Sequence, residues 1–190
     1  AQAAGRLILR PHSGVWRGGN ATALRKRRVG VMEATAAKAV GTRGKTTYQL
    51  QSFEVVKELG NGSYGLVKEV RHRTTNESFA MKIIDKGQIV RMDLQEQLKR
   101  EVLVQLKVRH PNVVQLLYYF EESSRIYCLM ELSDAGNLFR YMRRHRQAGS
   151  GGGLSEGRAS RLFTDTASGL GYLHGLKIAH RDMKPENVLL

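Results

Sequence analysis

The segment His180–Leu190, which reads HRDMKPENVLL, places an aspartate, a lysine and an asparagine within six positions. These residues are Asp182, Lys184 and Asn187, and an apolar run follows them directly. A carboxylate, an ammonium group and an amide this close together suggest a chemical site. Which reaction they serve depends on the elements that position them and on the partners that the rest of the chain supplies.

Size and composition limit the possible classes of protein. The chain has 190 residues, of which 41% are hydrophobic, so we expect a buried core. It contains no run of apolar residues long enough to span a membrane, and we expect no membrane association. Cys128 is the single cysteine, which excludes an internal disulfide and favours a cytoplasmic or nuclear location.

The net charge of +14 is concentrated at the N-terminus. Residues 1–47 hold ten Lys/Arg and one acid, whereas residues 48–190 hold 21 Lys/Arg and 16 acids. The sequence therefore predicts a disordered basic leader over residues 1–47 and a domain over residues 48–190. For the folded domain we expect no nucleic-acid partner, because most of the positive charge lies in the leader and the domain itself is only mildly basic.

The leader allows several interpretations. The run Leu24–Arg28 is typical of a solvated charge run, and it also fits a nuclear signal or a phosphate-binding patch. The acid-poor composition fits a transit peptide, and translation could instead begin at Met32. Residues Ala39–Thr46 match a phosphate-loop pattern. We expect no function there, because no strand precedes the pattern and no helix follows it.

Three glycines in Gly60–Gly65 separate two segments with strand-like alternation, Phe53–Leu59 and Leu66–Arg71. A glycine-rich dinucleotide-binding turn would lead directly into a helix, so this loop is predicted to join two antiparallel strands. Because glycine has no Cβ, backbone amides can approach a phosphate chain closely. Three glycines exceed what a plain hairpin turn needs, and the loop is therefore predicted to bind phosphate.

The strand predicted over Phe79–Ile84 carries a lysine among apolar residues. Alternation puts Phe79, Met81 and Ile83 on one face, and Lys82 on the other between Ala80 and Ile84. A buried lysine is costly unless it is paired, although a lysine on an edge strand could extend to water.

A partner for Lys82 is predicted in the helix that follows, from Met92 to about Val108. Leu94, Leu98, Val102 and Leu106 form its apolar stripe, and Glu101 falls within that stripe. An inward-facing carboxylate needs a cation, so Lys82 and Glu101 are predicted to pair. Lys82 would then reach the phosphates beneath the glycine loop.

From about Phe53 to Leu190 the sequence resembles the protein kinase family. The matching motifs occur in the family's order: Gly60–Val67, Ala80–Lys82, Glu101, His110–Asn112 and His180–Asn187. The resemblance implies an α+β, bilobal fold. Its small lobe, residues 48–132, would be a mainly antiparallel sheet with one helix. Residues 133–190 would form the hinge and the first half of a mainly helical large lobe.

The resemblance assigns roles to the charged and polar residues. Asp182 would orient or accept the proton of the attacking hydroxyl, and Lys184 would stabilise charge on the transferred phosphoryl group. Asn187 would be a Mg²⁺ ligand, while Lys82 and Glu101 complete the catalytic set. With a lysine two positions after the aspartate, the sequence resembles the serine/threonine class of protein kinases. The implied function is a serine/threonine protein kinase, a transferase that uses ATP and Mg²⁺ to phosphorylate a protein hydroxyl.

The resemblance also implies a nucleotide site between the lobes. The carbonyl of Glu131 and the amide of Ser133 would hydrogen-bond the adenine. His180 and Cys128 are interpreted as core residues, and Glu186 and Asp134 suggest a basic substrate. The full set implied to bind the nucleotide is Leu59, Gly60, Asn61, Gly62, Ser63, Tyr64, Gly65, Val67, Ala80, Lys82, Glu131, Ser133 and Leu189.

The family pattern continues beyond Asn187 with a strand, an Asp-Phe-Gly segment and an activation segment, none of which occurs in these 190 residues. We therefore expect negligible transferase activity from this piece alone, and phosphorylation of a generic peptide would contradict that. The alternative is a truncated nucleotide-binding or interaction module without catalysis. Intact Lys82, Glu101, Asp182 and Asn187 favour the kinase, because a pure scaffold does not need them.

Overall fold

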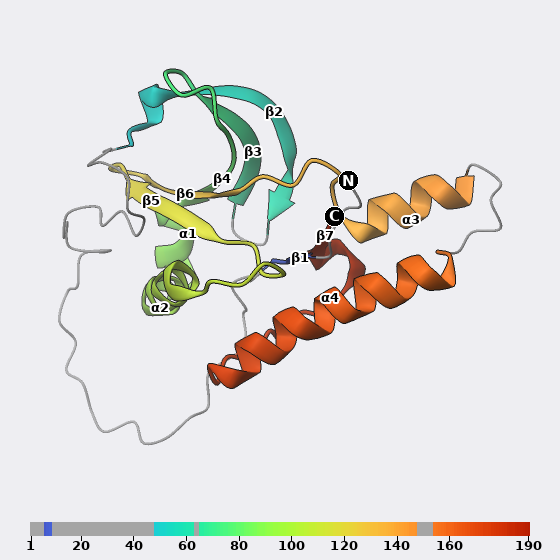
Figure 1. Cartoon of the computed structure of the whole chain (residues 1–190). Coiled ribbons are helices and arrows are strands. Elements are labelled where there is room, and N and C mark those ends of the chain that lie inside the picture. The colour runs from blue at the N-terminus through green and yellow to red at the C-terminus, as the bar shows by residue number, and fades with distance from the viewer. Residues whose placement is uncertain (1–5, 9–47, 63–64, 148–153) are drawn as a thin grey trace, which may run out of the picture.

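The computed structural model describes residues 6–8, 48–62, 65–147 and 154–190. Its small lobe is a five-stranded antiparallel sheet with strand order β2-β3-β4-β6-β5 (Figure 1). The short 3-10 helix Leu50–Ser52 leads into the first of these strands. The five strands are β2 (Phe53–Gly62), β3 (Gly65–His72), β4 (Ser78–Asp85), β5 (Leu116–Glu121) and β6 (Arg125–Glu131).

The alternation predicted for Phe79–Ile84 is confirmed by the two faces of β4. Phe79, Met81 and Ile83 pack in one apolar cluster, which contains an aromatic group around Phe53. Ala80 and Ile84 belong to a second cluster, on the face that α2 covers. The sheet therefore separates two cores, and Lys82 lies on the face that turns toward the helix.

Two helices, rather than the single one predicted, follow β4. Helix α1 (Lys86–Arg91) begins at Asp85, whose side chain accepts a hydrogen bond from the Gln88 amide at 2.8 Å. Helix α2 (Gln95–Lys107) starts three residues later than predicted, since Asp93 has a φ of 54° and interrupts the helix. The predicted apolar stripe is confirmed for the three of its residues that lie within α2, because Leu98, Val102 and Leu106 are buried.

The large lobe contains α3 (Leu138–Gln147), α4 (Glu156–Gly175), the 3-10 helix Pro185–Asn187 and the short strand β7 (Val188–Leu189). Figure 1 shows α3 to the right of the sheet and α4 below it, following the segment after β6. Leu162 and Leu173 are buried, whereas Phe163 is 75% exposed. None of the helices within the described ranges has the length and apolar character needed to cross a bilayer.

Residues 6–8 of the leader are part of the fold, which its composition did not predict. Strand β1 (Arg6–Leu7) pairs antiparallel with β7. Leu7 is 0% exposed, its amide donates to the carbonyl of Asn112 at 2.8 Å, and its carbonyl accepts from the amide of Val114 at 2.7 Å. The prediction of disorder is wrong for these residues. The rest of the leader, including Leu24–Arg28 and Ala39–Thr46, lies outside the described residues.

Replacing Leu7 by aspartate should detach this segment, because a charge at that buried position would have no water around it. The amide of Val114, which donates to the carbonyl of Leu7, is the reporter. We expect its hydrogen exchange to accelerate about tenfold or more, which corresponds to a decrease of about 1.4 kcal/mol in the free energy of local opening. Val55→Asp, at an exposed position of β2, is the matched control and should leave Val114 protected. Unchanged protection in Leu7→Asp would contradict the pairing of β1 with β7.

Candidate active site

A cavity of about 1440 Å³ lies between the sheet and the large lobe. Its walls come from β2, β3, β4 and β6, from α2 and α3, and from the segment around His180. It brings together most of the residues predicted to bind the nucleotide, although they come from distant parts of the sequence. Those that line it are Leu59, Gly60, Asn61, Val67, Ala80, Lys82, Glu131, Ser133 and Leu189.

The glycine loop joins β2 and β3 as predicted, with Gly62 paired to Gly65. Gly60 has a φ of +149°, a conformation that side chains with a Cβ rarely adopt. At Gly65 a Cβ would lie 1.8 Å from the carbonyl oxygen of Ile83, so this glycine is needed for the packing of β3 against β4. Gly65 does not line the cavity, and Ser63 and Tyr64 lie outside the described residues.

Lys82 and Glu101, which the sequence predicts to pair, line the same cavity from β4 and α2. The side-chain amide of Gln97 donates to Oε1 of Glu101 at 3.1 Å, which helps to orient the carboxylate. Their ion pair stays a prediction, but the fold places the two residues on facing elements of one cavity.

Cys128 lies opposite Lys82 in the register of β4 and β6 and is buried, as interpreted from the sequence. Burial raises the pKa of its thiol to about 11, although the nearby charge of Lys82 acts in the opposite direction. The thiol is therefore protonated at neutral pH, and Cys128 is a packing residue rather than a nucleophile.

Asp182, Lys184 and Asn187 form one hydrogen-bonded group. Nζ of Lys184 lies 2.9 Å from Oδ1 of Asp182, and Nδ2 of Asn187 donates to Oδ2 of Asp182 at 2.9 Å. The same Nδ2 also donates to the Asp182 carbonyl at 2.7 Å. Each carboxylate oxygen of Asp182 is thus held by a different side chain, which restricts its orientation.

The backbone before Asp182 is held in an unusual conformation. Arg181 has a φ of +62°, which a residue with a Cβ adopts only at some cost in free energy. His180 is buried, and its Nε2 lies 2.7 Å from the carbonyl oxygen of Ile8, which agrees with the structural role interpreted for it. Strained residues of this kind are frequent at functional sites, where surrounding contacts maintain them.

Asn187 has a carboxamide oxygen that suits a metal ion. The residue is 0% exposed, and its Oδ1 has no hydrogen-bond partner among the described residues. Buried oxygens usually have a partner, and amide oxygens are ligands that Mg²⁺ accepts. No group of three or more His, Cys, Asp or Glu side chains in the described ranges could hold a metal. The residues present therefore fit a Mg²⁺ that keeps several waters and binds phosphate oxygens.

Two parts of the cavity were not predicted from the sequence. Ile8 lines it from the leader, and three arginines of α3, Arg140, Arg143 and Arg144, line it from the large lobe. Nothing in the leader indicated the position of Ile8. The arginines recur at intervals of three and four residues in a helix, a spacing that could have indicated a common face.

The protein kinase domain model matches residues 53–190, the range over which the resemblance was recognised. An Aurora kinase of Saccharomyces cerevisiae is 36% identical over 161 residues, which cover 83% of this chain and 42% of the relative. The serine/threonine-protein kinase Aurora-1 of Arabidopsis thaliana is 33% identical over 158 residues, covering 83% and 52%. CBL-interacting protein kinase 26 of Oryza sativa is 36% identical over 146 residues, covering 77% and 28%. The chain spans about half or less of the length of these relatives.

Proposed function

The chain belongs to the protein kinase family, and from that premise we propose that it binds ATP with Mg²⁺ in the cavity between its lobes. We further propose that the protein transfers the γ-phosphoryl group to a serine or threonine hydroxyl of a protein substrate. The similarity to proteins named serine/threonine kinases supports this class of acceptor, as does Lys184, two residues after Asp182.

The observation that carries the proposal is the group formed by Asp182, Lys184 and Asn187. In this group both carboxylate oxygens of Asp182 are held by neighbouring side chains. The buried Oδ1 of Asn187 has no hydrogen-bond partner among the described residues. Phosphoryl transfer depends mainly on positioning and on charge stabilisation, and these are the properties that such a group supplies.

In the proposed reaction the substrate hydroxyl oxygen attacks the γ-phosphorus, and the bond to the leaving ADP oxygen breaks. The hydroxyl proton passes to the carboxylate of Asp182, and Lys184 stabilises the charge of the transferred group. Mg²⁺, when bound at Asn187, neutralises charge on the phosphates. Lys82 is proposed to hold the phosphates, with Glu101 orienting it.

Nucleotide recognition is proposed to combine apolar and backbone contacts. Ala80, Val67 and Leu189 line the cavity and would enclose the adenine ring. The carbonyl of Glu131 and the amide of Ser133 would supply its hydrogen bonds, since both residues also line the cavity. The hydroxyl of Ser133 donates to the carbonyl of Leu190, which links this segment to the end of β7.

Asn187→Leu tests the metal ligand at nearly constant side-chain volume. We expect the wild-type chain to bind ATP about tenfold or more tightly with Mg²⁺ than with a chelator, and Asn187→Leu to lose that difference. Asn187→Asp is the matched control, because it keeps an oxygen ligand and removes the amide that donates to Asp182. It should retain the dependence on Mg²⁺, as measured by calorimetric titration. If Asn187→Leu kept the full dependence, Asn187 would not be the ligand.

A further inference from the structure

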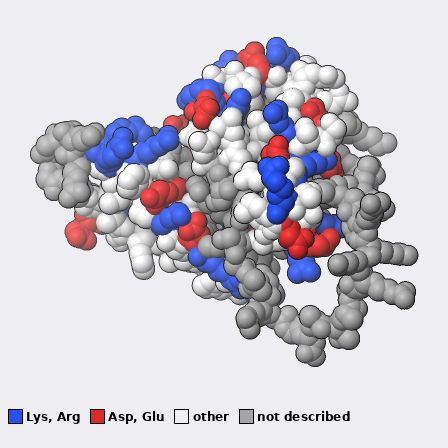
Figure 2. All heavy atoms as spheres, turned by 180° about the vertical axis from the view of Figure 1, so that it is seen from behind, with Lys and Arg blue, Asp and Glu red and all other residues white. Residues whose placement is uncertain are grey.

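Helix α3 presents three arginines to the cavity. Arg140, Arg143 and Arg144 are exposed and all line it, and their spacing of three and four residues places them on one side of the helix. Figure 2 shows Lys and Arg atoms gathered over this helix. The cavity therefore has a positively charged wall on the side of the large lobe.

No ion pair between described residues neutralises these arginines, although Glu186 lines the same cavity. Residues 135–155 contain four arginines and no Asp or Glu, whereas α2 mixes Glu96 and Glu101 with its basic residues. None of the ion pairs formed between described residues involves Arg140, Arg143 or Arg144. Like charges at these spacings destabilise a helix slightly, so stability alone does not explain the cluster.

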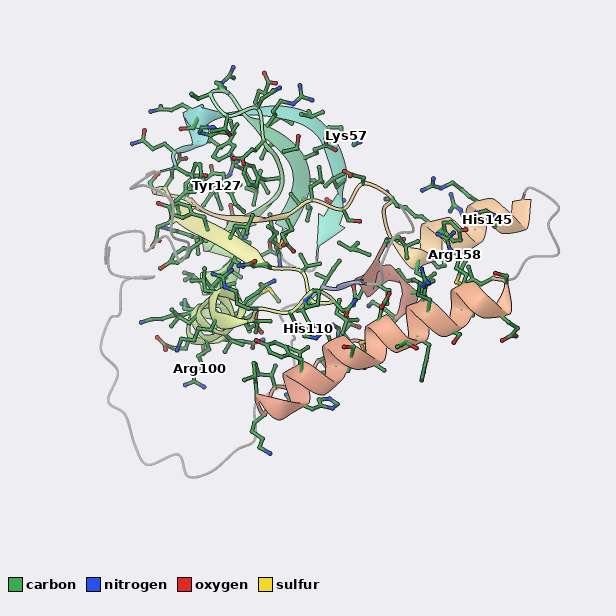
Figure 3. The ribbon with its side chains drawn as sticks, viewed as in Figure 1. Lys57, Arg100, His110, Tyr127, His145 and Arg158 are labelled. Atoms are coloured by element: carbon green, nitrogen blue, oxygen red, sulfur yellow. The ribbon has the colours of Figure 1, made fainter. Side chains whose placement is uncertain are left out.

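A cation–π contact joins α3 to α4, next to an aromatic contact within α3. The rings of Tyr141 and His145 lie 4.2 Å apart, and the guanidinium carbon of Arg158 on α4 lies 4.4 Å from the centre of the Tyr141 ring. Figure 3 shows Arg158 between the two helices and His145 on α3. The amide of Arg140 donates to Oδ1 of Asn137 at 2.8 Å, which stabilises the start of the helix.

Two of the arginines extend along the edge of the cavity. A guanidinium nitrogen of Arg140 lies 3.8 Å from the position that a Cβ on Gly60 would occupy. A guanidinium nitrogen of Arg144 likewise lies 3.8 Å from the position that a Cβ on Gly136 would occupy. The arginines thus line the edge that runs from the first glycine of the phosphate loop to the segment after β6.

We infer that this arginine face of α3 binds acidic or phosphorylated side chains of the protein substrate. The inference rests on the proposed kinase function and names the substrate class. Guanidinium groups bind carboxylates and phosphates through paired hydrogen bonds, and an exposed cluster of them suits an incoming anion. The basic substrate suggested by Glu186 and Asp134 fits less well, because Asp134 does not line the cavity and Glu186 shares the cavity with three arginines.

The test measures binding of short fluorescent peptides to the whole 190-residue chain. Each peptide has a central serine flanked by glutamate, phosphoserine, glutamine or arginine. We expect the glutamate and phosphoserine peptides to bind about tenfold or more tightly than the glutamine peptide, with affinity falling as salt is added. Arg143→Glu/Arg144→Glu should abolish the preference. Arg91→Glu/Lys107→Glu, an equal change of charge at exposed positions that do not line the cavity, should retain it.

Equal binding of the glutamine and glutamate peptides would overturn the inference. So would tighter binding of the arginine peptide, or binding of a single-stranded oligonucleotide that depends on Arg143 and Arg144 as strongly as the acidic peptides do. Nucleotide titrations on the same samples separate this inference from the proposed function. A wild-type chain that binds Mg²⁺–ATP but shows no preference among the peptides would contradict the inference alone, whereas a wild-type chain that binds no nucleotide would contradict the function.

Discussion

Ala80→Trp should abolish ATP binding while the fold is retained. Ala80 is 8% exposed, lies beside Lys82 on β4 and lines the cavity with Val67 and Leu189. An indole ring at this position would fill the volume that we assign to the adenine. We expect the affinity for ATP to fall at least about 100-fold, which corresponds to about 2.7 kcal/mol, as measured by calorimetric titration.

The matched control is Ala167→Trp, because Ala167 is exposed on α4 and does not line the cavity. It should bind ATP as the wild type does. Ala80→Leu provides a second, smaller obstruction if the tryptophan variant fails to fold, and it should show an intermediate loss. Wild-type affinity in a folded Ala80→Trp or Ala80→Leu variant would exclude adenine binding against β4.

Gly65→Ala should strongly destabilise the small lobe. The added Cβ would lie 1.8 Å from the carbonyl oxygen of Ile83, 2.8 Å from its carbonyl carbon and 3.2 Å from Cα of Ile84. All three are backbone atoms of β4, so β3 and β4 would have to separate to accommodate a methyl group. We expect the free energy of unfolding in urea to fall by about 3 kcal/mol or more.

Gly171→Ala is the control for the change of glycine to alanine. Gly171 lies within α4, and nothing lies within 4 Å of the position its Cβ would take. Alanine there should raise the free energy of unfolding by about 0.5–1 kcal/mol, because it restricts the unfolded chain and favours the helix. Equal stabilities of wild type and Gly65→Ala would contradict the register of β3 and β4.

Local patterns were enough to predict the elements that position the site. Lys82 was placed on the correct face of its strand, because side chains alternate across a sheet with a period of two. The helix carrying Glu101 was predicted because Leu98, Val102 and Leu106 recur at the helical period and need burial. The roles assigned to Asp182, Lys184 and Asn187 came from the family resemblance, and the structure shows these side chains bonded to one another.

Features that depend on distant contacts were not predicted. The pairing of Arg6–Leu7 with β7 joins segments at opposite ends of the chain, and nothing in the leader's composition indicates it. Phe163 is an apolar residue of α4 next to the buried Leu162 and is nevertheless exposed, because residue type alone does not specify which side of a helix has a neighbour. Likewise, the position of the α3 arginines at the cavity depends on how α3 packs beside α4.

The most direct test of the account is amide hydrogen exchange of the 190-residue chain with and without ATP and Mg²⁺. We predict that the nucleotide slows exchange at Ser133, at Gly60–Gly62 and at Val188–Leu189, segments that meet around one cavity, and that a chelator weakens this protection. No protection at millimolar ATP, or protection confined to segments away from the cavity, would contradict the claim that this site binds Mg²⁺–ATP.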